Sequence, residues 1–465
     1  MKFALHLYHS TPAFLWPVLA SAKSLLLKRR RYGKIYARAV PAIQERTSWP
    51  REAWKKFQEE QLGELLDRAA SRVPAYMSTA VAGSGRSGLE RLNTWPLVDL
   101  DHFRNNPEAY VDPEFGLSRR ITLYTSGSTG TPKKIIRDRR AEELNYAYME
   151  ARWLRTAGVS ASDRWVMIGG QLVVPVTRKR PPFWVPAYPT QQLYMSSYHL
   201  QDEYAEHYMA AIRRWSPAYI LGYASSLEAL ARFSEKTGIR VTPKAILSNA
   251  EPLYAHVRER LERVFSCSVR DTYGGTEGAF QGFECNHGSL HISPDFGVFE
   301  ILREDGTPCG PGELGRAVVT GLTNRAMPLI RYPTGDLVAW ARQQDCECGC
   351  TFPVISVVEG RSDDVIELPS GRRVGRLDPA FKGDLPIREA QIIQRVDYSI
   401  DVLVVPEINT ASGRVWKEEH AAQLVLALRE RLGPDLPVNV RLTDRIPRAA
   451  NNKFRAVVRE KRREH

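Results

Sequence analysis

From about residue 120, short apolar segments alternate with amphipathic helical segments, and this alternation constrains the fold more than any other feature. We expect the second helix of the series to open with a capping box of Ser225 and Glu228, and the third to carry Pro252 in its first turn. Strands that alternate with helices predict an α/β fold. The expected strands span 165–168, 218–221, 245–247 and 317–320, and the expected helices span 204–215, 226–236 and 252–265.

The chain has 465 residues, more than one hydrophobic core normally serves, and its pattern changes over the last hundred. There, segments 391–396, 400–405 and 438–442 are predicted strands, and Leu424, Leu428 and Leu432 share one face of a predicted helix. Before the α/β region, residues 51–72 form an amphipathic pattern. We therefore expect a large N-terminal α/β domain with several sheets (1–359, with 1–50 as a candidate peripheral extension), a hinge at 360–365, and a small, mobile α+β domain at 366–465.

Basic residues outnumber acidic residues by 65 to 53, which gives a net charge of +12. The excess is spread along the chain without a nucleic-acid-binding motif, so we exclude nucleic acid as a partner and expect a surface that suits a polyphosphate substrate. The apolar stretch 12–20 is shorter than the roughly 18–20 residues that span a bilayer, and no cleavage site follows it. We expect a cytoplasmic protein. A weak membrane-surface contact through the N-terminus and a homodimer both stay open.

The strongest local motif runs from Tyr124 to Lys134 and reads Tyr-Thr-Ser-Gly-Ser-Thr-Gly-Thr-Pro-Lys-Lys. Its glycines permit a tight turn whose N–H groups can face phosphate oxygens, and its hydroxyls and Lys133 add donors and a positive charge. The position of Lys133 excludes the P-loop NTPase pattern, and a flexible Ser/Gly hairpin is the structural alternative. The predicted phosphate-binding residues are Thr125, Ser126, Gly127, Ser128, Thr129, Gly130 and Lys133.

Four further motifs follow in order, and each alone is compatible with an ordinary turn. In the first, Thr276 can bond a phosphate and Glu277 is a hard oxygen ligand for Mg²⁺. In the second, Asp336 follows an expected strand and can accept both hydroxyls of a ribose. The four motifs are Tyr273-Gly274-Gly275-Thr276-Glu277-Gly278, Tyr332-Pro333-Thr334-Gly335-Asp336, Gly360-Arg361-Ser362-Asp363-Asp364 and Pro447-Arg448-Ala449-Ala450-Asn451-Asn452-Lys453.

Together, in this order and spacing, the five motifs resemble the adenylate-forming superfamily of acyl-CoA synthetases and adenylation domains, over about residues 50–465. The chain looks closest to the phenylacetate–CoA ligase and CapK-like branch. The resemblance implies that Lys453 catalyses adenylation, Asp363 is the hinge and Arg361 assists Asp336 at the ribose. Asn452 departs from the usual Gly before this Lys, although Asn tolerates a left-handed backbone. The remaining implied nucleotide-binding residues are Ala250, Glu251, Tyr273 and Gly274.

The resemblance implies an AMP-forming ligase that uses ATP and Mg²⁺ to activate a small carboxylic acid as an acyl-adenylate, and an aryl acid is one candidate. The expected acceptor is coenzyme A. The segment from Gly371 to Val374 lacks the usual Glu-rich continuation, which bears on the second half-reaction. The alternatives are an amide-forming ligase, a membrane-associated enzyme of polysaccharide or lipid assembly, and a non-catalytic nucleotide-binding relative; retention of Glu277, Asp336 and Lys453 argues against the last.

Two Cys/His segments follow the Thr276 and Asp336 motifs, and we expect their loops to converge on a structural zinc ion. Zinc prefers four soft or borderline ligands in a tetrahedron, and four protein ligands leave no open position for catalysis. His287 and Cys350 are substitute ligands, and six reduced, unligated thiols are the alternative. The predicted ligands are Cys285, His291, Cys346 and Cys348.

Overall fold

The computed structural model describes residues 7–79, 87–125, 133–361, 366–369, 373–374, 377, 381, 385–406, 415–432, 436–448 and 454–460. The chain divides into two compact units. One unit holds residues 1–334 and 338–358, and the other holds residues 335–337 and 359–465. The two units are described separately below.

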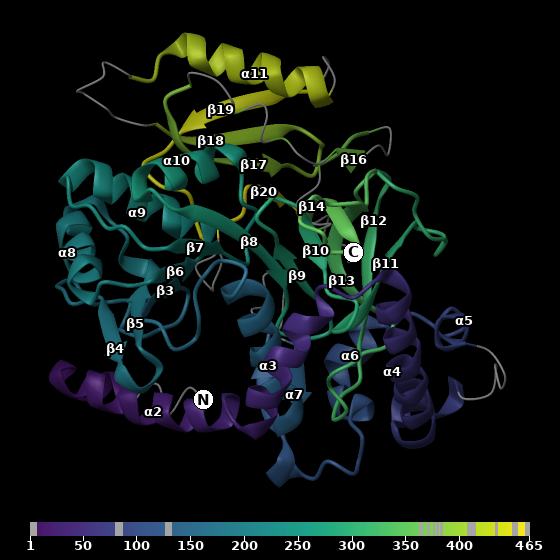
Figure 1. Ribbon diagram of the computed structural model, residues 1–465. Coiled ribbons are helices and arrows are strands. Elements are labelled where there is room, and N and C mark those ends of the chain that lie inside the picture. Colours follow the sequence, from purple (N-terminus) through teal and green to yellow (C-terminus); the bar gives the residue numbers. More distant parts are fainter. Residues whose placement is uncertain are drawn as a thin grey trace. The chain divides into compact units, whose positions relative to one another are not determined.

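The largest sheet runs in the order β11-β12-β13-β14-β10-β9-β8-β7-β6-β3-β5-β4 (Figure 1). Strands β5, β3, β6, β7 and β8 are parallel to one another, β4 is an antiparallel edge strand, and β8 pairs antiparallel with β9. The sheet therefore combines a parallel half with an antiparallel half. Its strands are β3 (Trp165–Gly169), β4 (Trp184–Ala187), β5 (Gln192–Ser196), β6 (Tyr219–Gly222), β7 (Ala245–Ser248), β8 (Ser268–Gly274), β9 (Gln281–Glu284), β10 (Leu290–Ile292), β11 (Gly297–Leu302), β12 (Leu314–Gly321), β13 (Tyr332–Trp340) and β14 (Val354–Arg361).

The parallel half has its own hydrophobic core beneath three helices, α8 (Ala205–Trp215), α9 (Ala224–Thr237) and α10 (Ala255–Phe265). Every residue of β6 and β7 is buried, as expected for parallel strands covered on both faces. Tyr208, Phe233 and Phe265 are among the largest fully buried side chains of this core. The packing of these helices holds the parallel strands in place, and the predicted nucleotide-binding motifs lie at the ends of those strands.

Most of the predicted elements are found, with two local corrections. Helix α9 has Tyr223 as its N-cap and no capping side chain, so the capping box of Ser225 and Glu228 is wrong. The N–H of Ser225 donates instead to Glu251 Oε2 at 2.9 Å. Helix α10 begins at Ala255, so Pro252 precedes the helix instead of occupying its first turn.

The antiparallel half packs on a second core together with α4 (Arg51–Arg72), α5 (Gly88–Leu92) and α6 (Leu100–Asn105). The helix predicted at 51–72 has these same bounds, and it buries Leu62, Leu65, Leu66 and Ala69. A separate hairpin of β1 (Ile121–Tyr124) and β2 (Lys134–Arg137) pairs Tyr124 with Lys134. The phosphate-loop motif therefore begins and ends on paired strands.

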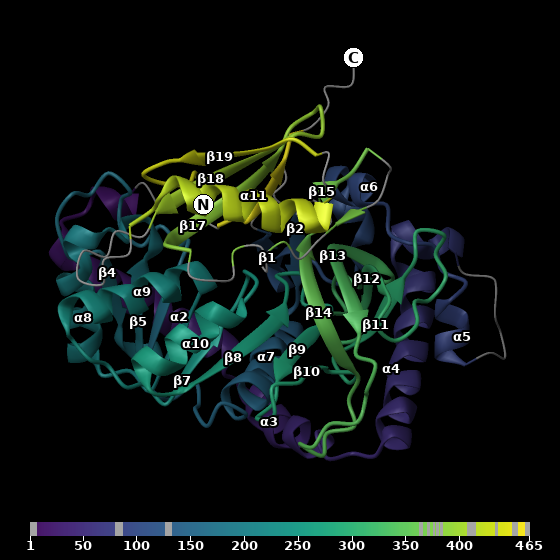
Figure 2. The ribbon, with the colours of Figure 1, turned by 90° about the horizontal axis from the view of Figure 1, so that it is seen from above.

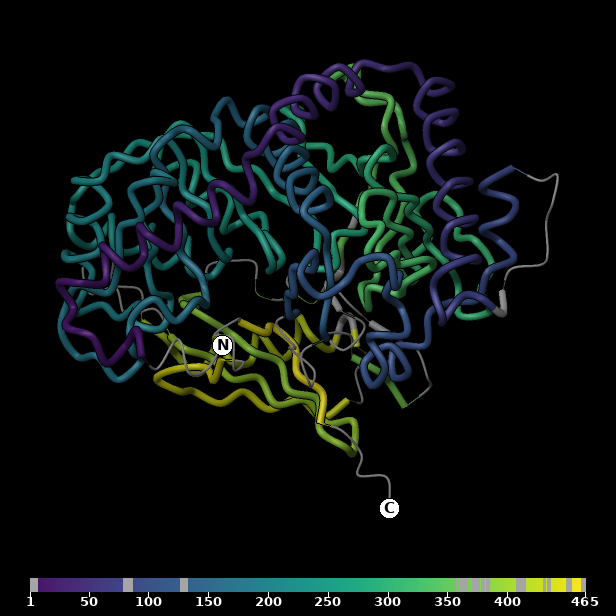
Figure 3. Tube along the Cα trace, turned by 90° about the horizontal axis from the view of Figure 1, so that it is seen from below, coloured from purple at the N-terminus to yellow at the C-terminus, as the bar shows by residue number. Residues whose placement is uncertain are grey.

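Residues 16–46 form two helices on the outside of the larger unit, α2 (Trp16–Arg31) and α3 (Lys34–Arg46) (Figures 1 and 3). Helix α2 lies against β4 and against α7 (Arg139–Tyr148), and α3 lies against α7, which continues into a π-helical turn at 149–154. Trp16 and Ile43 are buried at these contacts. Among the described residues, none of the helices is both long and apolar enough to cross a bilayer.

The smaller unit is an α+β fold in which one sheet, ordered β19-β18-β17-β20, packs on α11 (Figure 2). Strands β17 and β18 correspond to the predicted strands 391–396 and 400–405. They form an antiparallel hairpin, and β19 and β20 add in parallel. Leu424, Leu428 and Leu432 lie buried on one face of α11, as their spacing predicts. The elements are β15 (Ile366–Glu367), β16 (Arg373–Val374), β17 (Ile387–Gln394), β18 (Ile400–Pro406), α11 (Glu418–Leu432), β19 (Val438–Leu442) and β20 (Val457–Arg459).

Candidate functional site

Two predicted nucleotide-binding segments lie side by side at the carboxyl edge of the parallel strands. Strands β7 and β8 are adjacent and parallel, with Ser248 opposite Asp271. The N–H of Asn249 donates to the carbonyl oxygen of Gly222 at 3.0 Å, and Thr272 Oγ1 donates to the carbonyl oxygen of Ser248 at 2.8 Å. The chain therefore leaves β6, β7 and β8 at one edge, the usual place for ligands in such sheets.

The segment after β7 turns sharply through Ala250, whose φ of 64° lies in the left-handed region. Ala250 is exposed, whereas Glu251 is buried and accepts the N–H of Ser225 near the start of α9. Non-glycine residues adopt this backbone rarely and mostly where the surrounding structure holds it. Glu251 thus fixes the turn, and Ala250 presents its backbone at the carboxyl edge.

The motif that follows β8 forms a tight turn in which glycine has a steric role. The N–H of Gly278 donates to the carbonyl oxygen of Gly275 at 3.1 Å, and Gly278 has a φ of 62°. A Cβ at Gly275 would lie 2.4 Å from Glu277 Oε2, so the carboxylate of Glu277 folds back over Gly275. Thr276 is exposed and Glu277 is half-buried. Two of the three predicted catalytic residues, Thr276 and Glu277, therefore lie on one exposed turn, and Lys453 is the third.

The base of the phosphate-loop motif is held by the β1–β2 hairpin. The N–H of Thr125 donates to the carbonyl oxygen of Lys133, and the N–H of Lys133 donates to Thr125 Oγ1, each at 3.0 Å. Lys133 Nζ donates to the hydroxyl of Tyr332 at 2.7 Å, and it lies 5.0 Å from the centre of that ring. The contact joins the first motif to the Tyr332–Asp336 motif, which follows it by about two hundred residues.

Sequence reasoning missed Arg137, the last residue of β2, which joins the same hairpin to the Thr276 turn. Arg137 Nη2 donates to the carbonyl oxygen of Thr276 at 2.6 Å. A Cβ at Gly278 would lie 2.6 Å from the same nitrogen, so the guanidinium packs directly beneath the turn. Arg137 is 5% exposed, and a lone Arg at a strand end carries no pattern that could have identified it.

Glu142, at the start of α7, is the anionic partner of Arg137. The two side chains approach to 3.3 Å, and Glu142 also lies 3.1 Å from Arg30 and 3.6 Å from Arg31 of α2. Glu142 is 2% exposed, and three cations share its charge. Arg137 is therefore fixed on one side by this carboxylate and on the other by the Thr276 carbonyl.

The remaining predicted residues are placed to different extents. Asp336 is half-buried within β13, so the prediction that it follows a strand is wrong; Gly335, with a φ of 87°, distorts the strand beside it. Arg361 ends β14. The structure describes no geometry for Ser126, Gly127, Ser128, Thr129, Gly130, the hinge residue Asp363 or Lys453, which lie outside the described residues.

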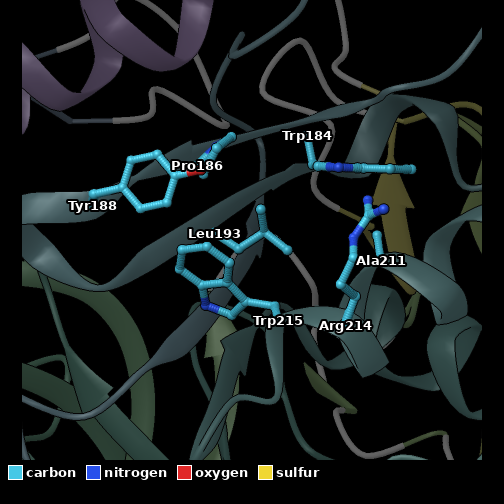
Figure 4. Close-up of a pocket in the computed structure, with 7 residues that line it drawn as sticks. All are labelled: Trp184, Pro186, Tyr188, Leu193, Ala211, Arg214 and Trp215. Carbon is cyan, nitrogen blue, oxygen red and sulfur yellow. The ribbon is translucent and has the colours of Figure 1, made fainter.

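One pocket of the larger unit, about 230 Å³, lies away from these motifs (Figure 4). Trp215 lines it, and Trp215 Nε1 donates to the carbonyl oxygen of Trp165, the first residue of β3. The pocket therefore adjoins the amino edge of the parallel strands, opposite to the edge that carries Ala250 and Thr276. Its lining residues are Trp184, Pro186, Tyr188, Leu193, Ala211, Arg214 and Trp215.

Several aromatic side chains between the phosphate-loop motif and Thr276 pack in the core. Phe183 is buried and stacks on His199 with ring centres 4.5 Å apart. Tyr219 is buried and stacks on Trp165 at 5.5 Å. These positions stabilise the sheet, so they carry no information about the acid.

The four predicted metal ligands form one compact cluster. Their ligand atoms all lie within 4.8 Å of one another, with Cys285 Sγ 3.7 Å from Cys346 Sγ and Cys348 Sγ 3.3 Å from His291 Nε2. Cys285 directly follows the strand β9, His291 lies in β10, and both cysteines of the second pair lie between β13 and β14. Since β10 pairs with both β9 and β14, the sheet brings the two loops together.

The surroundings of the Cys/His cluster orient its members. His291 Nδ1 lies 3.1 Å from the carbonyl oxygen of Phe352, a hydrogen bond that requires the proton on Nδ1 and leaves the Nε2 lone pair facing the cluster. Burial lowers the pKa of His291, which favours the neutral ring. The substitute ligands lie elsewhere: His287 is exposed beside Glu347, and Cys350 is buried against Trp54 and Phe352.

The sequence matches one family model and several characterised relatives. The AMP-binding enzyme family model matches residues 119–322. Protein CapK of Staphylococcus aureus is 24% identical over 466 residues, covering 97% of this chain and 98% of the relative. Phenylacetate-coenzyme A ligase of Thermus thermophilus is 25% identical, covering 88% of this chain and 97% of the relative.

Solved structures share the fold. A 2-hydroxyisobutyryl-CoA ligase in its postadenylation state has a TM-score of 0.69 at 18% identity, covering 90% of this chain and 91% of that one. An anthranilate CoA ligase has a TM-score of 0.52 at 16% identity, covering 72% of this chain and 65% of that one. The chain therefore carries an AMP-binding enzyme domain, and over nearly its whole length it resembles the branch of the adenylate-forming superfamily that contains the phenylacetate–CoA ligases and CapK.

Proposed function

We propose that the protein is an AMP-forming carboxylic acid–CoA ligase, which joins a small acid to AMP and then transfers the acyl group to coenzyme A. The observation that carries the proposal is the convergence of motifs distant in sequence. Arg137 ties the hairpin that bears the phosphate loop to the Thr276 turn, and Lys133 ties it to Tyr332. The match to the AMP-binding enzyme family supports the same chemistry.

In the first half-reaction, the acid carboxylate attacks the α-phosphorus of ATP and pyrophosphate leaves. A carboxylate is a weak nucleophile, so positioning and charge neutralisation supply most of the rate. The residues from Thr125 to Lys133 hold the departing phosphates, and Thr276 donates to the phosphate that stays with the acid. The backbone around Ala250 flanks the adenine, and Asp336 and Arg361 hold the ribose. Lys453 stabilises the charge that develops at the α-phosphate.

Glu277 is the proposed ligand for Mg²⁺, which neutralises phosphate charge when it is bound. Its half-buried carboxylate lies on the exposed turn beside Thr276, and magnesium in nucleotide sites commonly binds through one or two carboxylates plus phosphate oxygens. The turn holds the Glu277 carboxylate over Gly275, where no side chain of residue 275 competes for the space.

In the second half-reaction, the proposed acceptor is the thiol of coenzyme A, which attacks the acyl carbon and releases AMP. The smaller unit rotates about Asp363 between the two steps, withdrawing Lys453. An amine acceptor would give an amide by the same displacement. The released product distinguishes them, because mass spectrometry of a reaction with both acceptors present identifies a thioester or an amide directly.

A screen for ATP–pyrophosphate exchange over a panel of carboxylic acids tests the first half-reaction. We expect acid-dependent exchange that requires Mg²⁺ and falls by at least about a hundredfold in Glu277→Ala, since a metal ligand in the reacting complex is lost. Glu64→Ala, which removes an exposed carboxylate on α4, is the matched control and should exchange normally. Full exchange in Glu277→Ala would exclude the metal role of Glu277. If none of the acids on a broad panel supports exchange, the proposed reaction is excluded.

We further propose that the Cys/His cluster binds one structural zinc ion. A zinc tetrahedron with bonds of about 2.3 Å to sulfur and about 2.0–2.1 Å to nitrogen separates two sulfurs by about 3.8 Å and a sulfur from a nitrogen by about 3.6 Å. The distances of 3.7 Å and 3.3 Å in the cluster agree with these values to a few tenths of an ångström. A cytoplasmic location suits the proposal, because a reducing compartment keeps such thiols available to a metal.

Metal analysis of protein purified without chelator tests the zinc proposal, with about one zinc per chain expected. Cys346→Ser should lower the zinc content, whereas Cys309→Ser, which changes a buried thiol outside the cluster, should not. Absence of zinc, together with unchanged stability in Cys346→Ser, would refute it.

A further inference from the structure

Helix α2 carries several large apolar side chains on the face that points away from the protein. The exposed positions recur at helical spacing, whereas the buried face is narrow and holds Trp16 and Ser24. Val18 is 63% exposed and Leu26 is 66% exposed, although a surface helix normally turns such a stripe inward. The apolar stripe consists of Val18, Leu19, Leu25 and Leu26 of α2, together with Phe14 and Leu15 of the short 3-10 turn that precedes the helix.

The N-terminal segment that carries this apolar stripe has charged side chains of one sign. Residues 1–44 contain eight Lys and Arg residues and neither Asp nor Glu. Lys23, Lys28 and Arg29 are exposed on the same helix, whereas Arg30 and Arg31 turn inward to Glu142. An apolar stripe with flanking cations and no carboxylate is complementary to the surface of an anionic bilayer.

The position of α2 in the fold leaves the apolar stripe accessible. The helix runs along the outside of the larger unit, against β4 and the turn at 188–190 (Figure 3). Tyr188 lies beside it: its N–H donates to Ser21 Oγ at 3.3 Å, and its ring is 62% exposed. Tyrosine is enriched where protein meets lipid headgroups, because its ring is apolar and its hydroxyl is polar.

We infer that α2 is a membrane-surface anchor that lies flat in the headgroup region of an anionic bilayer. Phe14, Val18 and Leu26 enter the boundary with the acyl chains, and Lys23, Lys28 and Arg29 face the lipid phosphates. A second copy of the chain is the competing occupant of the stripe. The charge disfavours it, because pairing two copies of this helix brings basic segments together without any carboxylate between them.

Flotation of the full chain with lipid vesicles tests the anchor. We expect binding to vesicles of equal parts phosphatidylglycerol and phosphatidylcholine, little binding to phosphatidylcholine alone, and weaker binding at high salt. Lys23→Glu with Lys28→Glu should weaken binding by at least about 25-fold, since each cation near an anionic surface strengthens binding about fivefold. Val18→Glu with Leu26→Glu should weaken it by at least about tenfold.

Leu426→Glu is the matched control, because Leu426 lies 63% exposed on α11 of the smaller unit and should leave flotation unchanged. No flotation of the parent chain, equal flotation with both lipids, or retained flotation in the Val18/Leu26 variant would each overturn the anchor. A dimer that the Val18/Leu26 substitutions dissociate, without flotation, would assign the stripe to self-association instead. The substitutions lie outside the nucleotide-binding motifs, so pyrophosphate exchange without vesicles reports separately on the proposed reaction.

Discussion

Replacing Arg137 by Met should destabilise the protein and impair adenylation together, because this side chain supports the Thr276 turn from beneath. Met fills part of the same volume but donates no hydrogen bond to the Thr276 carbonyl and no charge to Glu142. A hydrogen bond from a charged group contributes about 1.5–3 kcal/mol. Breaking a buried ion pair costs about 3–5 kcal/mol when the remaining charge is left alone, but Glu142 keeps Arg30 and Arg31. We therefore expect a loss of about 2–3 kcal/mol.

Urea unfolding followed by tryptophan fluorescence measures this loss, and pyrophosphate exchange measures the effect on the turn. A displacement of about 1 Å at a reacting group costs up to about a hundredfold in rate, so exchange should fall by about ten- to a hundredfold at saturating ATP. Arg137→Lys should recover part of both losses, because Lys keeps a charge and one donor.

Arg139→Met is the control for Arg137→Met. Arg139 is the next Arg along the chain, but its side chain is 66% exposed and its ion pair with Glu143 lies partly in solvent. An exposed pair of this kind contributes under about 1 kcal/mol. If Arg137→Met unfolds at the same urea concentration as Arg139→Met and exchanges pyrophosphate at the parent rate, the proposed support of the Thr276 turn is wrong.

Three other predictions concern the separation of the two half-reactions, the metal cluster, and the pH dependence of stability. Lys453→Ala should abolish adenylate formation yet spare thioester formation from a synthetic acyl-adenylate. Asp363→Pro should do the reverse, because Pro fixes φ at the hinge. Equal loss of both steps in both folded variants would contradict the two-conformation scheme. Cys348→Ser and chelator treatment should each lower the midpoint of thermal unfolding, whereas Cys267→Ser should respond to chelator as the parent does. Burial lowers the pKa of His199, so its contribution to stability is present above the unfolded-state pKa of about 6.5 and is lost as the pH falls through that value toward the folded-state pKa. Urea unfolding at pH 7.5 and pH 5 should therefore show a steeper loss for the parent than for His199→Gln, and equal slopes would contradict this.

The sequence was informative where residue identity and spacing follow directly from chemistry. The Cys/His cluster is an example, because the ligand types and the strands that carry them predicted the four residues that converge. The strands at 165–169, 219–222 and 245–248 were predicted to within a residue or two, because fully buried β-strands leave short apolar runs.

The sequence was uninformative where tertiary contacts replace a local signal. Ser225 and Glu228 match the capping-box pattern, but Glu251 reaches the N–H of Ser225 from a loop 26 residues away. Arg137 gives no signal because the Thr276 carbonyl, 139 residues away, reaches it only when the β1–β2 hairpin and the large sheet are assembled. Such contacts depend on side-chain reach across elements, which no periodicity encodes.

The acidic start of α7 has a consequence for any shortened version of this protein. Glu142 depends on Arg30 and Arg31, and Glu143 Oε2 accepts the N–H groups of Ile35 and Tyr36 at 3.0 Å and 3.2 Å. A chain trimmed to begin at Arg51 would retain every adenylate-forming motif while leaving two adjacent buried carboxylates without these partners. Such a truncation should aggregate or fold poorly, even though the residues removed contain none of the catalytic groups. Removing the membrane-facing side chains one at a time is therefore the informative way to separate anchoring from folding.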